Sequence, residues 1–390
     1  PSTGECWYSR QRGGTLSPVG RAAGASLMKR RGDLFSTLVS IDNLRRAHQN
    51  ARKGKTHYYA VKLVDADPDY YLRELQVELV SGTFATSPYT TKVIYEPKER
   101  TIYKLPYYPD RIVHHAVMQV MQPIWDRQFI HDLYSAIPGK GLHAGSYRLR
   151  QFLKDANRTR YCLKFDISKF YPSIRPDKMF EIVQRSVKDR GVLGVLRDVI
   201  YSSPNAGVPI GNYLSQYFSN LYLTPFDHWL KEKMRARYYI RYCDDGVILH
   251  RDKGWLQDLM HKIEEFFDTL GLRLNPKTSI FPVDRCGVDF LGYRTFRTHT
   301  ILRKSSARRL KKKVREIEQN YLTMSPDAIL GSLGAYHGWL KHCDCHNFAR
   351  KYLYENPAIR TAVEYATELK GIKCPTWLEA PSSRRRSAST

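Results

Sequence analysis

The sequence has 390 residues, of which 42% are hydrophobic and 26% are charged. These fractions are ordinary for a globular protein and exclude collagen, a long disordered chain and a coiled coil. The length predicts two to three domains, or one large elaborated domain. No apolar run approaches the roughly 20 residues of a membrane span, and no signal peptide is recognisable. The odd number of cysteines, seven, does not make a disulfide scaffold and indicates a reducing, cytoplasmic location.

The charge balance indicates a polyanionic partner. Lys and Arg number 63 against 38 Asp and Glu, which gives a net charge of +25 and a pI of about 9.7. A field of this sign attracts phosphate backbones. The 27 tyrosines add rings that stack on bases wherever they are exposed. The composition therefore favours a nucleic acid as the partner over a merely solubilising surface.

The two ends of the chain differ in composition from its middle. Residues 1–32 are rich in Gly, Ser, Arg and Ala and predict a disordered tail, within which Met28 is a candidate natural start. Residues 377–390 predict a second disordered tail. Between them, the pattern is mixed α and β over residues 33–297 and helical, with a high density of basic residues, over residues 298–376. We expect the helical segment to form a domain of its own.

Apolar spacing predicts the elements in chain order. Helices are expected over 34–50 and 70–81, with Asp33 and Asp69 as N-caps. Residues 93–105 predict a hairpin around a turn at 97–99. Further helices are expected over 110–129, 176–189, 212–233, 255–270 and from 305 to about 369, and strands over 160–167, 238–250 (a hairpin) and 288–293.

Two predicted strands end in acidic residues. The first contains Asp166, and the second runs through Tyr242-Cys243-Asp244-Asp245-Gly246. Asp-Gly between two β-rich runs is typical of a hairpin turn, so the turn is expected at Asp245-Gly246, with both acids at its tip. If this hairpin pairs beside the first strand, Asp166 and Asp244 converge. Carboxylates that repel one another need cations, and two Mg²⁺ ions about 3.5–4 Å apart would suit a nucleotidyl transfer.

Several blocks resemble one family. Residues 242–245 match the YxDD box of reverse transcriptases, and residues 165–174 are similar to the first palm motif of that family. Residues 98–105, 134–141, 271–278 and 289–293 resemble its fingers hairpin, its template-contacting block, the block after the YxDD hairpin and its primer grip, in that order. The resemblance extends over residues 33–370. It implies an α+β right-hand polymerase with fingers and an antiparallel palm sheet over 33–297 and a helical thumb over 298–376.

A narrower resemblance concerns residues 210–216. The block Ile210-Gly211-Asn212-Tyr213-Leu214-Ser215-Gln216 is similar to the (I/V/L)GxxxSQ form found in diversity-generating retroelements, where other bacterial relatives carry Gln first. That family copies a template RNA, misincorporates opposite adenines and diversifies a target gene with the cDNA. An apolar side chain in place of a polar amide removes hydrogen bonds worth about 1–3 kcal/mol each in base discrimination. Packing drift at a helix N-terminus is the alternative explanation.

The resemblance implies roles for individual residues. Asp166, Asp244 and Asp245 would be catalytic metal ligands for Mg²⁺, with Mn²⁺ as a substitute, joined by the Ile167 carbonyl. Lys277 would be the general acid for pyrophosphate departure. The expected nucleotide-binding residues are Lys98 and Arg100 on the phosphates, Tyr171 as steric gate, Ile210 and Gly211. The expected phosphate-binding residues of the thumb are Arg303, Lys304, Arg308, Arg309, Lys311, Lys312, Lys313 and Arg315.

These features together predict an RNA-directed DNA polymerase of bacterial or phage origin. Its expected partners are template RNA, cDNA, dNTPs and a small basic accessory protein that forms a homo-oligomeric ring. Two alternatives stay open: another bacterial reverse transcriptase of the group II intron, retron or defence type, or a non-catalytic RNA-binding scaffold. The complete set of three acids argues against the scaffold.

Overall fold

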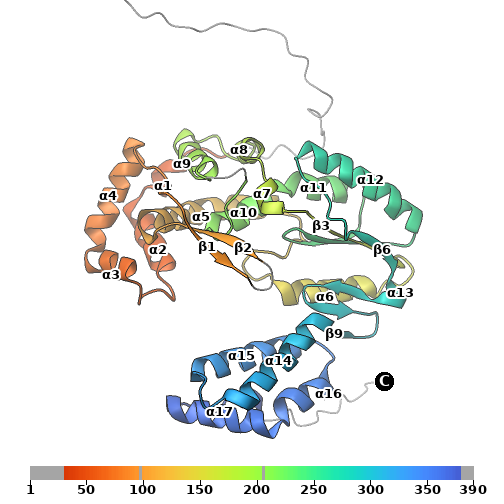
Figure 1. Ribbon diagram of the computed structural model, residues 1–390. Helices are drawn as coiled ribbons and strands as arrows, with labels where there is room; N and C mark the ends of the chain where they lie inside the picture. Colours follow the sequence, from red (N-terminus) through yellow and green to blue (C-terminus); the bar gives the residue numbers. More distant parts are fainter. Residues whose placement is uncertain (1–29, 96–98, 204–206, 379–390) are drawn as a thin grey trace, which may run out of the picture.

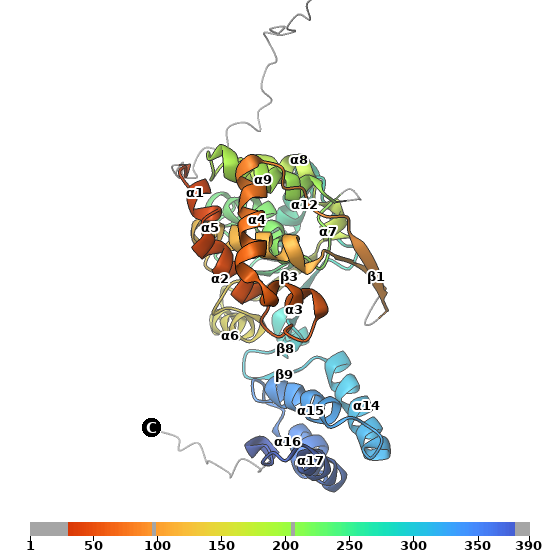
Figure 2. The same ribbon diagram turned by 90° about the vertical axis from the view of Figure 1, so that its left-hand side faces the viewer.

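The computed structural model describes residues 30–95, 99–203 and 207–378 (Figures 1 and 2). An N-terminal group of elements forms the fingers. Its members are α1 (Phe35–Leu38), α2 (Ile41–Ala51), α3 (Tyr59–Ala66), α4 (Pro68–Ser81), β1 (Thr90–Ile94), β2 (Arg100–Lys104) and α5 (Ile112–Trp125).

The central part of the chain forms the palm and the helices that cover it. Its helices are α6 (Leu142–Leu153), α7 (Phe170–Ser173), α8 (Pro176–Gln184), α9 (Arg190–Tyr201), α10 (Tyr213–Tyr222), α11 (Thr224–His228), α12 (Lys253–Thr269) and α13 (Val283–Cys286). Its strands are β3 (Tyr161–Asp166), β4 (Tyr238–Tyr242), β5 (Asp245–His250), β6 (Ser279–Pro282), β7 (Val288–Phe290), β8 (Tyr293–Thr295) and β9 (Thr300–Leu302).

The palm is built on an antiparallel sheet with strand order β4-β5-β3-β6. Its two faces are covered differently, as the alternation of a strand requires. Leu163 and Phe165 of β3 enter the large core that the palm shares with the fingers, whereas Cys162 enters a smaller core that lies toward α6 and β7. The sheet is therefore buried on both sides, and only its edges and turns reach the surface.

The thumb is a separate helical unit. It consists of α14 (Lys304–Asn320), α15 (Pro326–Leu340), α16 (His346–Ala349) and α17 (Pro357–Lys370). These helices enclose their own cluster of buried side chains, among them Leu310, Leu333 and Val363. Both ribbon views place the thumb below the palm, connected through the small sheet β7-β8-β9 (Figures 1 and 2). Fingers, palm and thumb give the right-hand arrangement that the sequence predicted.

Two N-terminal boundaries differ from the predictions. The helix expected over 34–50 is interrupted, because Ser40 is extended and its hydroxyl accepts the Asn43 N–H at 3.3 Å to begin α2. Helix α4 begins at Pro68 and is capped by Asp67, which accepts the Tyr70 N–H, so Asp69 is not the cap. Proline at the first helical position sets this start, since it needs no hydrogen-bond acceptor. Among the described helices, none combines the length and apolar content of a membrane crossing.

Gly246 fits the middle of the sheet because it lacks a side chain. It lies directly across from Phe165 in β3 and from Arg241 in β4. A Cβ atom at this position would overlap the Phe165 ring. The ring therefore occupies the space that a larger residue in β5 would fill, and this packing requires glycine.

We expect Gly246→Ala to lower the free energy of unfolding by about 1–3 kcal/mol, because the buried Phe165 ring has to move. Urea unfolding followed by circular dichroism measures the change. Gly194→Ala is the control: Gly194 lies within α9, and its added Cβ would meet no atom within 4 Å. It should be neutral, or stabilising by up to about 1 kcal/mol through helix propensity. Equal destabilisation by both substitutions would contradict this account of Gly246.

Candidate active site

The turn between β4 and β5 presents the acidic residues. Tyr242 pairs with Asp245, so Cys243 and Asp244 form the two-residue loop. Cys243 has a φ of 55°, the left-handed conformation that tight hairpins need at their first central position. The predicted turn at Asp245-Gly246 is thus wrong by two residues. Asp244 lies at the tip, whereas Asp245 and Gly246 belong to β5.

Three carboxylates meet at this end of the sheet. Asp166, the last residue of β3, lies directly opposite Asp245 in the β3–β5 register. Burial and then the charge of Asp166 raise the pKa of Asp244, which the nearby Arg100 guanidinium partly opposes. Opposed carboxylates on neighbouring strands are destabilising without a cation. The sequence predicted this convergence, and the pKa shift shows its electrostatic cost.

The surroundings of Asp245 disfavour the charged form of its carboxylate. Burial raises its pKa to about 7; Lys164 opposes the rise, and Asp166 and Asp244 add to it. The Lys164 ammonium lies 3.8 Å from one carboxylate oxygen, while the other oxygen, Oδ1, is buried without a hydrogen-bond partner. A buried carboxylate oxygen without a donor is a position that a cation or a proton can satisfy.

Asn275 fixes the orientation of Asp166. Its side-chain amide donates to the Asp166 carboxylate at 2.9 Å, and its backbone N–H donates to the Asp166 carbonyl at 2.8 Å. A short bridge between Ile167 and Leu274 uses the Asp166 carbonyl and the Ser168 N–H, so it does not engage the Ile167 carbonyl. The segment after α12 therefore positions the first acid from behind.

A buried ion pair holds the acidic turn. Arg241 in β4 and Asp227 in α11 are both fully buried, with Nε to Oδ1 at 2.8 Å and Nη2 to Oδ2 at 2.5 Å. The remaining Nη1 donates to the Cys243 carbonyl at 2.7 Å. Burial alone would lower the pKa of Arg241, but the Asp227 carboxylate outweighs it and raises the pKa. The guanidinium stays charged and connects the turn to α11.

The other side of the turn is held by a neutral network. The Ser135 hydroxyl accepts the Cys243 N–H and donates to the Asn220 side chain, both at 2.9 Å. The Asn220 amide returns a hydrogen bond to the Ser135 carbonyl. The sequence predicted no role for Arg241, Asp227 or Asn220, and Ser135 and Asn275 were predicted only as members of the blocks 134–141 and 271–278. Only Arg241 gives a signal, because an arginine at an inward position of a strand requires an acidic partner.

Two of the predicted nucleotide-binding residues, Arg100 and Tyr171, lie near the acidic turn. Arg100 is the first residue of β2, and its charge acts on the Asp244 carboxylate. Lys98 lies outside the described residues. Tyr171 follows β3, and its hydroxyl lies 3.6 Å from the Cys243 sulfur. The Ile210 carbonyl accepts the Tyr103 N–H at 2.8 Å, which joins residues 210–211 to the β1–β2 hairpin.

Gly211 has a positive φ of 116°, and an added Cβ would meet the Tyr103 carbonyl at 2.8 Å. This close approach to the hairpin requires glycine. Lys277 is exposed, and its backbone N–H donates to the Asn275 side chain at 3.0 Å. Lys277 thus lies two residues from the group that orients Asp166.

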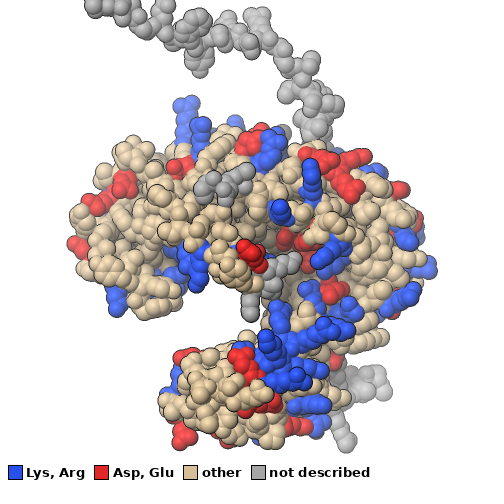
Figure 3. Space-filling model, in the orientation of Figure 1, with Lys and Arg blue, Asp and Glu red and all other residues tan. Residues whose placement is uncertain are grey.

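The basic residues of the thumb divide into two groups. Arg303 pairs with Asp289 of β7, Lys313 pairs with Glu316, and Lys311 lies 5.0 Å from the centre of the Tyr352 ring. The exposed ones are Lys304, Arg308, Arg309, Lys312 and Arg315. Figure 3 shows Lys and Arg gathered on the upper margin of the thumb, facing a hollow below the fingers and palm. The exposed group can contact phosphates, while Arg303 and Lys313 are already paired.

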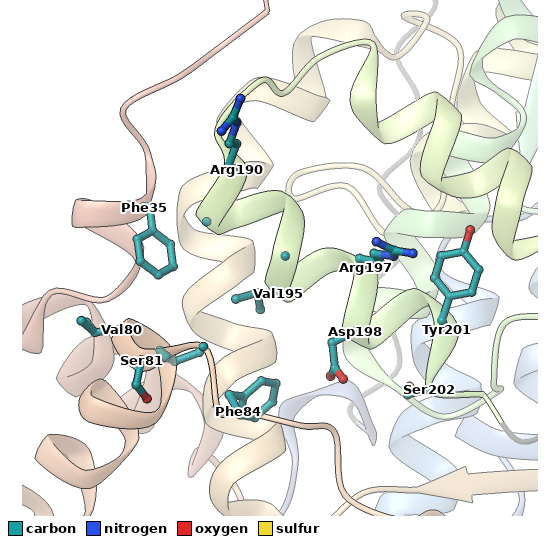
Figure 4. Close-up of a pocket in the computed structure, with 14 residues that line it drawn as sticks. Phe35, Val80, Ser81, Phe84, Arg190, Val195, Arg197, Asp198, Tyr201 and Ser202 are labelled. Atoms are coloured by element: carbon teal, nitrogen blue, oxygen red, sulfur yellow. The ribbon is translucent and has the colours of Figure 1, made fainter. Parts of the chain in front are cut away.

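A separate cavity lies away from the acids. It has a volume of about 700 Å³ between α1, α4 and α9 and is lined by Phe35, Phe84 and Val195, among others (Figure 4). Its half-buried acid, Asp198, already accepts the backbone N–H and the hydroxyl of Thr86. None of the three carboxylates lines it, so this cavity is not part of the candidate active site.

The carboxylates suit a cation whose remaining ligands come from the substrate and water. Within the described ranges, no three Asp, Glu, His or Cys side chains form a cage that could hold a metal ion unaided. Mg²⁺ does not need one, since it is usually bound by one or two carboxylates together with water and substrate phosphates. The unpartnered Asp245 oxygen and the mutual repulsion of the acids are consistent with such binding.

Comparison with known proteins assigns the fold and chemistry to a family. Residues 96–295, just over half of the chain, match the family described as reverse transcriptase (RNA-dependent DNA polymerase). The chain belongs to the reverse transcriptase family. It therefore carries an RNA-directed DNA polymerase domain, a nucleotidyltransferase that uses an RNA template.

The relatives of this reverse transcriptase domain are distant. The chain is 25% identical to Protein YkfC of Escherichia coli (strain K12), over 58% of this chain and 71% of that protein. It is 20% identical to the putative COX1/OXI3 intron 2 protein of Saccharomyces cerevisiae, over 68% of this chain and 38% of that protein. The intron 1 protein is 21% identical, over 67% and 39%. The chain thus spans less than two fifths of either intron protein.

Solved structures with a similar fold include two telomerases. The telomerase of Candida albicans, in complex with a TWJ fragment of telomeric RNA, aligns with a TM-score of 0.47 and 13% identity. The alignment covers 77% of this chain and 58% of that one. Apo telomerase of Candida tropicalis gives 0.45 and 13%, over 78% and 63%.

Asp245→Asn should stabilise the reverse transcriptase when a chelator removes divalent metal. Because the pKa of Asp245 is raised from 3.8 to about 7, the folded state binds the proton more tightly than the unfolded chain. The wild type should therefore lose stability relative to the variant as pH rises from about 4 to about 7, by on the order of 1–3 kcal/mol. Thermal unfolding in EDTA across this range measures the difference. Parallel curves for the two proteins would contradict the prediction, and Asp258→Asn on the exposed face of α12 is the control.

Proposed function

We propose that this protein is the reverse transcriptase of a diversity-generating retroelement and that it copies template RNA into cDNA with errors concentrated at template adenines. The polymerase chemistry rests on one observation: Asp166 lies opposite Asp245, and the turn next to them presents Asp244. The subtype rests on the Ile210-Gly211 block and its attachment to the β1–β2 hairpin.

In this proposal, Asp166 and Asp244 hold Mg²⁺ together with the substrate phosphates, and Asp245 and the Ile167 carbonyl support the site. The bound metal supplies Lewis-acid activation of the primer 3′-hydroxyl and charge neutralisation on the triphosphate. Asn275 keeps the Asp166 carboxylate oriented, and Arg241 prevents the turn from moving away. These groups are positioned before substrate binds, so little reorganisation is needed at the reacting centre.

The nucleotide lies between the hairpin and the palm. Arg100 contacts the β- and γ-phosphates, and its planar guanidinium suits bidentate contact with phosphate oxygens. The Tyr171 ring lies beneath the sugar and excludes a 2′-hydroxyl. Burial raises the pKa of Tyr171, so its hydroxyl stays neutral next to Cys243. Lys277 donates a proton to the departing pyrophosphate.

The apolar Ile210 side chain accounts for the low fidelity. No amide at this position holds the nucleotide or its template base, so the free-energy difference between right and wrong pairs is smaller. The exposed basic residues of α14 hold the duplex through its phosphates without reading sequence. The template RNA and a small basic accessory protein that forms a ring complete the proposed assembly.

A second candidate is a reverse transcriptase encoded within an intron. The similarity to the two yeast intron proteins favours it, over about two thirds of this chain. The SQ block at 215–216 favours the retroelement enzyme instead. The two candidates predict different error spectra.

Asp244→Ala should abolish primer extension on an RNA template, because two carboxylates cannot replace the lost metal ligand. Incorporation of labelled dNTPs in Mg²⁺ measures the effect, and an unchanged melting temperature shows that the variant is folded. Asp258→Ala, an acid on the far helix α12, is the matched control and should retain activity. Residual activity of Asp244→Ala near the wild-type level would refute the metal assignment.

Ile210→Gln should reduce errors at template adenines by about tenfold, the amount expected for one restored hydrogen bond of about 1–3 kcal/mol. Deep sequencing of cDNA from a defined RNA measures errors at each template base. A wild-type spectrum with uniform errors would favour the intron-type enzyme. An adenine-biased spectrum that Ile210→Gln leaves unchanged would exclude the amide mechanism but keep the subtype.

A further inference from the structure

The segment that joins α2 to α3 is strongly basic. Between Asp42 and Asp65 the chain has six Lys and Arg residues and no Asp or Glu; two of the six are paired, Arg45 with Asp69 and Arg52 with Asp65. Lys53 and Lys55 donate to neutral oxygens, those of the Asn50 side chain and the Ala51 backbone, so these contacts do not neutralise their charge. Lys62 is exposed on α3. This segment precedes the part of the chain that matches the family, and the site described above does not use it.

Two neighbouring tyrosines stand out from the same segment. Tyr58 is 55% exposed. Tyr59 is 79% exposed, which is the highest value among the large apolar and aromatic residues described. The His57 ring lies 4.3 Å from the Tyr58 ring and supports it from one side. Exposed rings between lysines offer stacking faces and phosphate contacts together, the combination that binds single-stranded nucleic acid.

A stacked pair of rings connects this segment with the nucleotide block. Tyr213, two residues after Gly211, is 40% exposed, and its ring stacks on His115 at 4.5 Å and 20°. Burial, and then the nearby charges of Lys55, Arg111 and Lys53, lower the pKa of His115 to about 4. The imidazole is therefore neutral at physiological pH, and the lysines lie close to it. Tyr213 thus follows the nucleotide block in the chain and stacks on a ring that lies near Lys53 and Lys55.

The position of this surface suits a strand entering the polymerase cleft. Both ribbon views place α3 at the lower edge of the fingers, with the thumb below it across a gap (Figures 1 and 2). Figure 3 shows Lys and Arg on both margins of the hollow between them. In the described part of the thumb, the groove along α14 is lined by basic residues such as Arg308, Lys312 and Arg315 and by no tyrosine. Among the described residues, the fingers side therefore combines positive charge with exposed rings, whereas the α14 groove offers charge alone.

We propose that Tyr213, Lys53, Lys55, Tyr58, Tyr59 and Lys62 form a track that holds unpaired template RNA before it reaches the nucleotide site. The lysines contact phosphates, and the two exposed tyrosines stack on successive bases, so the track accepts any sequence. Paired RNA offers no free base faces, which makes the track selective for the single-stranded template. The direction in which the template moves along this track follows from the proposed function, whereas the binding assay that tests the track does not depend on that function.

A binding assay without dNTPs tests the track independently of catalysis. The probes are primer–template duplexes whose RNA template extends beyond the primer by about 2 nucleotides, too few to fill a single-strand site, or by about 12, enough to fill one. Wild type should bind the longer overhang more tightly. The double variant Tyr58→Ala/Tyr59→Ala should lose at least about tenfold of that gain, as stacking on aromatic rings predicts.

Charge reversal and a matched tyrosine complete the test. Lys53→Glu/Lys55→Glu should reduce both the overhang gain and its dependence on salt. Tyr201→Ala, which removes a 50% exposed tyrosine from α9, should leave both unchanged. An overhang gain that survives both double variants would overturn the proposal, as would equal losses on both probes, which would mean duplex binding. A wild type that shows the gain but extends no primer would refute the proposed function and leave the track standing.

Discussion

The buried ion pair between Arg241 and Asp227 is the constraint on which the acidic turn depends. Two charges without solvent cost several kcal/mol unless their hydrogen bonds are satisfied. Here the guanidinium satisfies Asp227 and also the carbonyl of Cys243. Ser135 holds the N–H of the same residue from the other side. The two-residue loop is fixed at both ends of Cys243, so Asp244 cannot relieve its repulsion from Asp166 by moving away.

That fixed repulsion gives the site its chemistry. The protein carries a large positive charge overall but gathers three carboxylates at one turn. Burial and the nearby carboxylates raise the pKa values of Asp244 and Asp245. Holding these acids together therefore lowers the stability of the fold. The positive surroundings of the site, Arg100 on the hairpin and the exposed face of α14, attract a polyanion toward the acids. In the proposed mechanism, a cation bound together with the triphosphate would relieve the repulsion.

The sequence predicted the large features of the fold because they rest on strong local patterns. Alternating strands that end in Asp166 and in the YCDD box place the acids together, and 3.6-residue periods predict the helices. The failures have physical reasons. Asp245-Gly246 has the composition of a turn, but Gly246 is needed for the Phe165 ring, and the loop forms two residues earlier. Ser40 interrupts a helix whose apolar spacing continues through it.

The sequence did not predict contacts between residues that lie far apart along the chain. Nothing in the segment around Asp227 indicates that it meets Arg241, and nothing near Asn275 indicates that it orients Asp166. The charge run of the thumb was predicted as a single surface. In the structure Arg303 instead pairs with Asp289 and so ties the thumb to β7. Partners of this kind are set by tertiary packing, which local propensity does not encode.

The hydrogen bond from the Tyr103 N–H to the Ile210 carbonyl joins the β1–β2 hairpin to the block that we propose selects the base. Gly211 packs closely against the Tyr103 carbonyl, so the hairpin and residues 210–211 have no free space between them. Any closing of the hairpin onto a triphosphate therefore displaces the backbone of residue 210. In the proposed mechanism, phosphate binding by the hairpin and selection of the base pair at residue 210 are therefore coupled, and a change in one would alter the other.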